Sequence, residues 1–164
     1  MKHYIMLIIV ASISVALAVS YFDYREIRVS DRDIKPFKNK LNATIQQKHS
    51  FTMNEVTSFE WDRMIVLEPY MSIEQMEKAA GSRWTTGSYI GYLLERLKVD
   101  KYPLLDDAYC KLVFLKQDQV VLDVTLDRSS ADFLPISQLH YSDRSRLAVH
   151  KGNNGVLITW KENE

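Results

Sequence analysis

The stretch Cys110-Lys-Leu-Val-Phe-Leu-Lys-Gln-Asp-Gln-Val-Val-Leu-Asp-Val-Thr-Leu126 decides the fold of this chain. Residues 110–116 are nearly all apolar, which is typical of an interior strand covered on both faces. After Gln117 and Asp118, residues 120–126 largely alternate between apolar and polar, as in a half-buried strand. The two segments therefore predict an antiparallel hairpin.

A second hairpin is predicted farther along the chain. Leu147 and Val149 precede the turn-forming stretch 151–155, which contains Gly-Asn-Asn-Gly, and residues 156–160 resume the alternation. Residues 128–145, between the two hairpins, are predicted to form a loop.

Capping signals mark two helices before the first hairpin. Ser72-Ile-Glu-Gln75 is a capping box, and Gly81 supplies a left-handed terminator after Ala80. Asp33 is placed to cap an earlier helix with an apolar stripe. The residues of that stripe are Ile34, Phe37, Leu41 and Ile45.

The remaining periodic segments complete the predicted domain, which spans residues 34–164. Residues 89–97 repeat apolar side chains at helical spacing, whereas residues 51–59 and 61–67 are candidate strands. The sum predicts an α+β fold of two layers: an antiparallel sheet of about five strands with two or three helices packed on one face.

Residues 1–22 form an apolar leader before the domain, and residues 23–33 read as a charged linker. Two hypotheses fit the leader. It is either an export signal cleaved after Ala18 or Ser20, or a retained anchor that crosses the membrane through residues 4–22. Both hypotheses place the domain in the cell envelope, outside the cytoplasm, or secreted if the leader is cleaved.

The distribution of basic residues argues against this orientation. Lys2 is the only lysine or arginine before the apolar run, whereas several follow it between Arg25 and Lys40. Lysine and arginine flanks tend to stay in the cytoplasm. We nevertheless expect export, because signal-like N-termini are the commoner arrangement, and the basic flank favours a retained anchor over cleavage.

Composition excludes several function classes. The chain carries 21 basic and 21 acidic residues, so no strong field attracts nucleic acid. Its single cysteine, Cys110, lies in the most apolar segment and reads as a buried hydrophobic residue. No histidine stands at metal-ligand spacing with another ligand, so neither a metal nor another cofactor is predicted.

The acidic residues Glu60, Asp62 and Glu68 suggest one enzymatic hypothesis. Alternation along a strand would place all three on one side, where a pair could act as acid and base on wall glycans. Such chemistry requires a concave site and carboxyl groups with raised pKa values.

A cluster of aromatic and charged residues resembles a known layout. Phe59-Glu-Trp-Asp-Arg63 leads into Pro69-Tyr70, the capped helix from Ser72 to Gly81, Leu112-Val-Phe114 and Asp118-x-Val-Val121. This order resembles a recurrent group of small exported or membrane-anchored bacterial proteins over residues 51–126. The resemblance implies a bacterial envelope setting and no particular activity, and residues 82–103 have no place in it.

Four residues are the candidate binding residues: Trp61, Arg63, Tyr70 and Trp84. Aromatic and arginine side chains dominate contact energy at protein interfaces. The structural alternative is that Trp61 fills the core beneath the capped helix, while Asp62 or Arg63 ties its strand to a neighbour. The sequence favours a non-enzymatic envelope protein that binds another protein, for example an immunity-type protein, over the glycan hydrolase or a structural subunit of a membrane complex.

Overall fold

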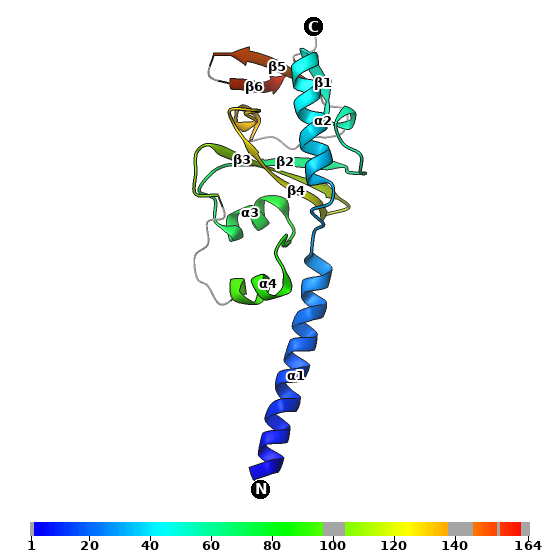
Figure 1. The fold of residues 1–164 in the computed structure, drawn as a ribbon, viewed down its shortest axis with the longest axis vertical. Coiled ribbons are helices and arrows are strands. Elements are labelled where there is room, and N and C mark those ends of the chain that lie inside the picture. The colour runs from blue at the N-terminus through cyan, green and yellow to red at the C-terminus, as the bar shows by residue number, and fades with distance from the viewer. Residues whose placement is uncertain (1, 97–103, 138–145, 154, 162–164) are drawn as a thin grey trace.

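The computed structural model describes residues 2–96, 104–137, 146–153 and 155–161, and it confirms the α+β class. Two three-stranded antiparallel sheets and four α-helices make up the described part of the chain (Figure 1). The helices are α1 Lys2–Ile27, α2 Ile34–Gln47, α3 Ile73–Ala80 and α4 Tyr89–Arg96. The strands are β1 Ser50–Thr52, β2 Arg63–Leu67, β3 Tyr109–Lys116, β4 Gln119–Asp127, β5 Arg146–Gly152 and β6 Gly155–Trp160.

The central sheet has the order β2-β3-β4, and its β3–β4 hairpin is the one that the apolar stretch predicts. Lys116 pairs with Gln119 across a two-residue turn, in which Gln117 and Asp118 have φ values of 50° and 61°. Positive φ at both central residues is the type I′ pattern that fits the twist of two antiparallel strands.

Both faces of this central sheet are buried, as the apolar character of residues 110–116 predicts. Side chains of Met64, Leu112 and Phe114 point into a large core with α2 and the second sheet. Ile65, Val113 and Leu115 point into a smaller core that α3 closes. The expectation that all helices pack on one face is therefore wrong, because α2 and α3 cover opposite faces.

The second sheet has the order β1-β5-β6 and is separate from the first, so the expected single sheet of about five strands is also wrong. The predicted β5–β6 hairpin forms, but β1 pairs with β5 and then stops at Thr52. There Thr52 and Glu55 make a capping box that starts a short 3-10 helix, Met53–Glu55. This turn ends the strand expected over residues 51–59. A second 3-10 helix, Leu134–Ile136, lies in the predicted loop, and residues 138–145 of that loop are outside the described residues.

Both helices with predicted caps form, but only α3 has the predicted side-chain cap at its N-terminus. Ser72 accepts a hydrogen bond from the Gln75 amide, and Gly81 ends α3 in the left-handed conformation with φ 71°, as predicted. In α2 the predicted stripe is buried, but the Asp33 side chain makes no capping hydrogen bond. Instead, the Asp33 carbonyl oxygen accepts the Phe37 amide at 3.0 Å.

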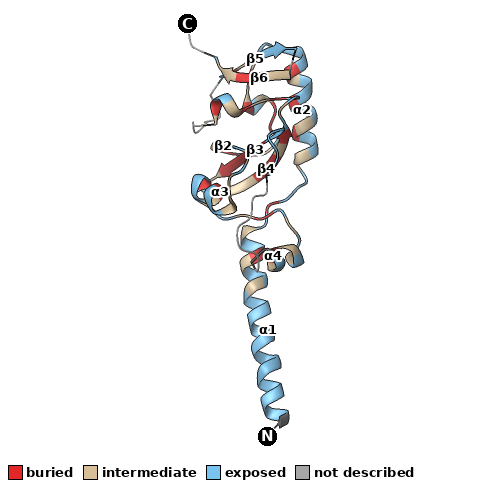
Figure 2. Cartoon of the chain, turned by 90° about the vertical axis from the view of Figure 1, so that its left-hand side faces the viewer, coloured by how far each residue is buried: buried red, intermediate tan, exposed pale blue. Residues whose placement is uncertain are grey.

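Helix α1 continues past the expected boundary at residue 22 and ends at Ile27. Tyr24 and Val29, inside the expected charged linker, are 4% and 6% exposed, so this segment belongs to the folded part of the chain. The first five turns of α1 project from the domain as an exposed rod, whereas its last turns meet α4 (Figure 2).

Candidate functional site

Trp61 is a core residue of the large cluster. Its indole Nε1 donates a hydrogen bond to Thr57 Oγ1 at 3.1 Å, and its ring meets Phe114 edge-on with centroids 5.3 Å apart. Trp61 is 8% exposed and lies on the α2 face of the central sheet, not beneath α3. The structure therefore supports the packing role for this residue and places it on the face opposite to the one expected.

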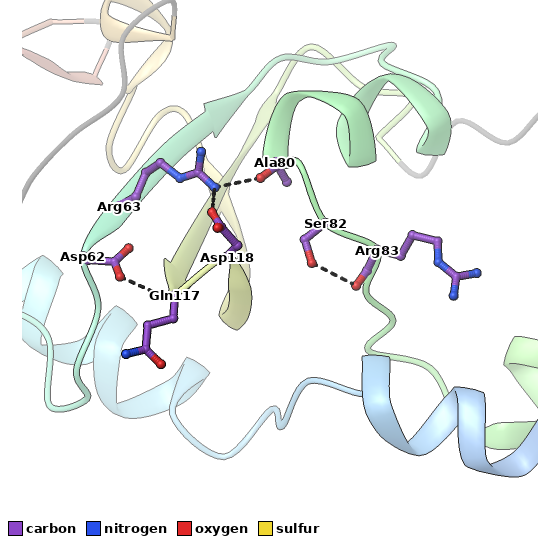
Figure 3. Close-up of polar contacts among 7 residues, drawn as sticks. All are labelled: Asp62, Arg63, Ala80, Ser82, Arg83, Gln117 and Asp118. Atoms are coloured by element: carbon purple, nitrogen blue, oxygen red, sulfur yellow. Dashed lines mark hydrogen bonds and ion pairs between the residues drawn. The ribbon is translucent and has the colours of Figure 1, made fainter.

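Asp62 and Arg63 tie β2 to its neighbours, as the structural alternative predicts (Figure 3). The Asp62 carboxylate accepts a hydrogen bond from the backbone amide of Gln117 at 2.7 Å. This contact gives a partner to an amide of the turn between β3 and β4. Arg63 Nη2 donates to the Ala80 carbonyl oxygen at 2.9 Å and to Asp118 Oδ1 at 3.0 Å. The guanidinium thus joins the C-terminal end of α3 to the same turn.

Trp84 lies on the α3 face of the central sheet, where it reaches a buried ion pair. Its Nε1 donates to Asp123 Oδ2 at 2.7 Å, and Lys111 Nζ donates to Asp123 Oδ1 at 2.5 Å. The side chains of Asp123 and Lys111 are 6% and 12% exposed. Every oxygen of this carboxylate has a donor, which is the condition under which a buried charge is tolerated.

Tyr70 differs from the other three candidates because its side chain is 52% exposed. Its φ of 63° is a left-handed conformation that a bulky residue rarely adopts, and its amide donates to the Leu104 carbonyl oxygen at 2.8 Å. Partial desolvation and the neighbouring Asp107 carboxylate raise the pKa of the Tyr70 phenol. The structure therefore does not bring the four candidates onto one surface: Trp61 and Trp84 pack on opposite faces of the sheet.

The structure does not bring Glu60, Asp62 and Glu68, the carboxylates of the hydrolase hypothesis, together in one site. Glu60 and Asp62 precede β2 and Glu68 follows it, so the strand, about 16 Å long, separates them. All three are exposed. Glu60 pairs with Lys116, whose hydrogen bond and charge lower the pKa of Glu60, the opposite of what a general acid requires. Ser137 Oγ donates to Glu68 at 2.6 Å.

The contact between α1 and α4 is a feature that the sequence analysis does not predict. Four tyrosines form an aromatic cluster there, which we call the α1–α4 cluster: Tyr21, Tyr24, Tyr89 and Tyr92. Tyr21 and Tyr89 meet edge-on at 5.2 Å, and Tyr24 lies 5.6 Å from Tyr92. The tyrosines have a spacing of three residues in both helices, which is the sequence signal that could have revealed the contact.

Polar contacts fix this cluster to the domain. The Asp23 carboxylate accepts Tyr92 Oη at 2.6 Å and Arg83 Nη2 at 3.0 Å. Tyr24 Oη donates to the Gly87 carbonyl oxygen at 3.1 Å, and Tyr89 Oη donates to the Leu17 carbonyl oxygen at 2.9 Å. The contacts therefore hold both the apolar part of α1 and its charged end.

The backbone beyond α1 continues the attachment. The amide of Thr85 donates to the last helical carbonyl, Ile27, at 2.9 Å, and the Val29 amide donates to the Thr85 carbonyl at 2.9 Å. Arg28, between them, lies 5.9 Å from the centre of the Tyr24 ring. The end of α1 is thus clamped by residues 83–92 rather than joined through a free linker.

Within the described ranges, α1 is the one helix long and apolar enough to cross a membrane, over residues 3–27, and its apolar window is not buried. The same ranges contain no group of three or more histidine, cysteine or acidic side chains arranged to hold a metal. Cys110 is buried, as predicted, and burial raises the pKa of its thiol.

No family model, curated protein or solved structure matches this chain.

Proposed function

We propose that this protein is anchored in a bacterial cytoplasmic membrane through α1, and that its domain binds another protein at the outer face. The observation that carries the anchor is the continuity of α1. The helix passes without a break from its exposed apolar turns to Ile27, and its last turns are clamped by residues 83–92. Residues 4–22, at about 1.5 Å per residue, match a hydrocarbon core of about 30 Å.

Retention of the leader accounts for the contacts of the α1–α4 cluster better than cleavage does. Ala18 and Ser20, the two sites at which a signal would end, lie inside α1. Leu17, just before them, supplies the carbonyl oxygen that Tyr89 binds. Cleavage at either site would remove this acceptor from the folded protein.

The exposed surface around Tyr70 supports the protein-binding part of the proposal. Tyr70 contacts Leu104 and Asp107. The same segment, residues 104–109, carries two more exposed hydrophobic side chains, Leu105 and Tyr109, with exposures of 68% and 39%. A bulky residue held at positive φ is a strained feature, and such features cluster at functional sites. The nearby carboxylates of Asp106 and Asp107 favour a partner that presents basic residues here.

The anchor and its orientation are tested on the protein made in cells. The expected results are a mass that includes residues 1–22, retention in membranes washed with alkaline carbonate, and digestion of the domain by protease added outside spheroplasts. A mature N-terminus at Val19 or Tyr21 would contradict retention. Protection of the domain from external protease would place it in the cytoplasm, as the basic flank alone suggests.

Partner binding is tested separately with a photo-crosslinking amino acid at position 70. We expect a discrete protein adduct at this position and none with the same amino acid at Lys35, an exposed residue of α2. Equal labelling at both positions, or none at either, would contradict a binding surface at Tyr70.

A further inference from the structure

Helix α4 exposes two large apolar side chains on one face. Ile90 is 69% exposed and Leu94 is 55% exposed, and their spacing of four residues puts them on the same side of the helix. Tyr92, which faces α1, is 5% exposed. Within the described part of the chain, the helix therefore packs one side against α1 and leaves Ile90 and Leu94 exposed on another side.

The position of α4 along α1 indicates what this apolar side could contact. Tyr89 touches the Leu17 carbonyl and the Tyr21 ring, so α4 lies level with the last turns of the apolar run 4–22. In Figure 1, α4 runs across the direction of α1 instead of along it. A helix that lies in the plane of a membrane surface has this relation to a helix that crosses the membrane.

The polar groups at this level suit the boundary of a bilayer. Tyrosines concentrate at membrane–water interfaces, where the ring is apolar and the hydroxyl finds a polar partner. Asp23 is the first charged residue after Lys2, and both of its oxygens accept donors from the domain. Its charge is therefore compensated within the protein and does not face anionic headgroups alone.

We propose that α4 lies in the interface of the bilayer that α1 crosses, with Ile90 and Leu94 inserted among the lipid chains. This inference rests on the proposed anchoring through α1. It commits to lipid as the occupant because the exposed apolar side chains of α1 cover its whole circumference from Tyr4 to Val10. A partner helix would cover one stripe of such a surface, whereas lipid surrounds all of it.

The consequence is a domain attached to the membrane at two places. α1 alone would leave the domain free to tilt with the helix relative to the bilayer. With α4 also inserted, the domain keeps one side toward the membrane, and the α1–α4 cluster fixes the angle between the two helices. The Tyr70 surface would then have a set orientation relative to the bilayer.

The test uses the full chain in vesicles of phosphatidylcholine and phosphatidylglycerol, labelled at one introduced cysteine with an environment-sensitive fluorophore. The three variants are Val10→Cys in α1, Ile90→Cys in α4 and Glu74→Cys, an exposed polar position of α3. The natural Cys110 stays in place, because burial shields its thiol and raises its pKa. Leu94→Cys serves as a second α4 variant, so that the test does not depend on one substitution.

We expect nitroxide-bearing lipids to quench the labels at positions 10, 90 and 94 at least about twofold more than the label at position 74, because an interfacial helix inserts about 5–10 Å. Quenching at position 10, with positions 90 and 94 no different from 74, would overturn the α4 inference and leave the anchor standing. Weak quenching at position 10 would overturn the anchor itself. Labels at 90 and 94 that are shielded from lipid nitroxide and from aqueous iodide would place α4 against a second copy, which also overturns the inference.

Discussion

The central sheet and the α1–α4 cluster are held together in different ways. The sheet buries apolar side chains on both faces, and three aromatic rings surround Phe114 with centroids 5.3 Å away. The α1–α4 cluster instead joins two helices through tyrosine rings and through hydrogen bonds that the tyrosine hydroxyl groups donate. Large apolar side chains beside it remain exposed.

This difference shows where the chain buries its apolar surface itself and where it leaves apolar surface exposed. A water-soluble domain rarely leaves a large contiguous apolar surface uncovered, and such surfaces mark protein or membrane contacts. The sheet satisfies that rule with its own side chains. In the arrangement that we propose, lipid covers the exposed apolar side chains of α1 and α4.

The largest effect is expected for Phe114→Ala, which would break the apolar side of the comparison. The ring is fully buried, and removing it leaves a cavity beneath Phe37 and Trp61. We expect the free energy of unfolding to fall by about 3–5 kcal/mol. Urea denaturation of the full chain in detergent micelles, followed by tryptophan fluorescence, would measure the loss.

The matched control is Phe59→Ala, because Phe59 contacts the same ring but is only partly buried. We expect a smaller loss for this variant. Equal losses for both would show that Phe114 is not the centre of the core.

The second largest effect is expected for Asp123→Ala. This substitution removes the carboxylate from the one buried ion pair described on the α3 face of the sheet. The substitution leaves the Lys111 ammonium without its carboxylate and the Trp84 Nε1 without an acceptor. We expect a loss of about 2–3 kcal/mol, below the full penalty for a broken buried pair because Lys111 retains some exposure.

A double variant separates charge burial from packing. Lys111→Met with Asp123→Leu removes both charges and keeps apolar volume, so most of the lost stability should return. Urea denaturation in detergent micelles would measure the free energy of unfolding of both variants. A double variant as unstable as Asp123→Ala would mean that the loss comes from packing around Asp123 or from the missing acceptor of Trp84 Nε1, and not from an unpaired charge.

The sequence predicts the sheet better than the α1–α4 cluster for a physical reason. Apolar periodicity and the Ser72 capping box are local signals, and they correctly predict β3, β4 and α3. The separation of the second sheet depends on a turn at Thr52 that competes with strand continuation. The three-residue spacing of the tyrosines marks one face of each helix, but the pairing of the two faces depends on contacts such as Asp23 with Tyr92, which join residues far apart in the chain. The binding candidates illustrate the same limit, since Trp61 and Trp84 look alike in sequence but pack on opposite faces.

A smaller, local effect is expected for Asp23→Ala, which would sharpen the comparison by loosening only the α1–α4 cluster. The variant removes the acceptor for Tyr92 Oη and Arg83 Nη2, a loss of about 1–2 kcal/mol. The amide of Tyr92, bonded to the Ser88 carbonyl at 2.8 Å, should then exchange its hydrogen about tenfold faster.

The control for this variant is Glu26→Ala, which removes an exposed acidic residue from the same helix. Amide exchange at Val113 in the buried strand β3 should stay unchanged in both variants. Faster exchange at Val113 in Asp23→Ala would show that the α1–α4 cluster and the sheet unfold together and would break the comparison between them.

The smallest effect is expected for Gln117→Asn in the turn of the central hairpin. Gln117 adopts φ 50°, a left-handed conformation that asparagine tolerates better than glutamine does. The amide that Asp62 accepts is retained, so the substitution relieves local strain without removing a contact. We expect the free energy of unfolding to rise by about 0.5 kcal/mol, measured against Gln119→Asn, an exposed position of β4 just beyond the turn. An equal gain at position 119 would attribute the effect to the exposed surface and not to the turn. A gain at position 117 alone would show that the left-handed conformation of Gln117 costs stability in the central hairpin.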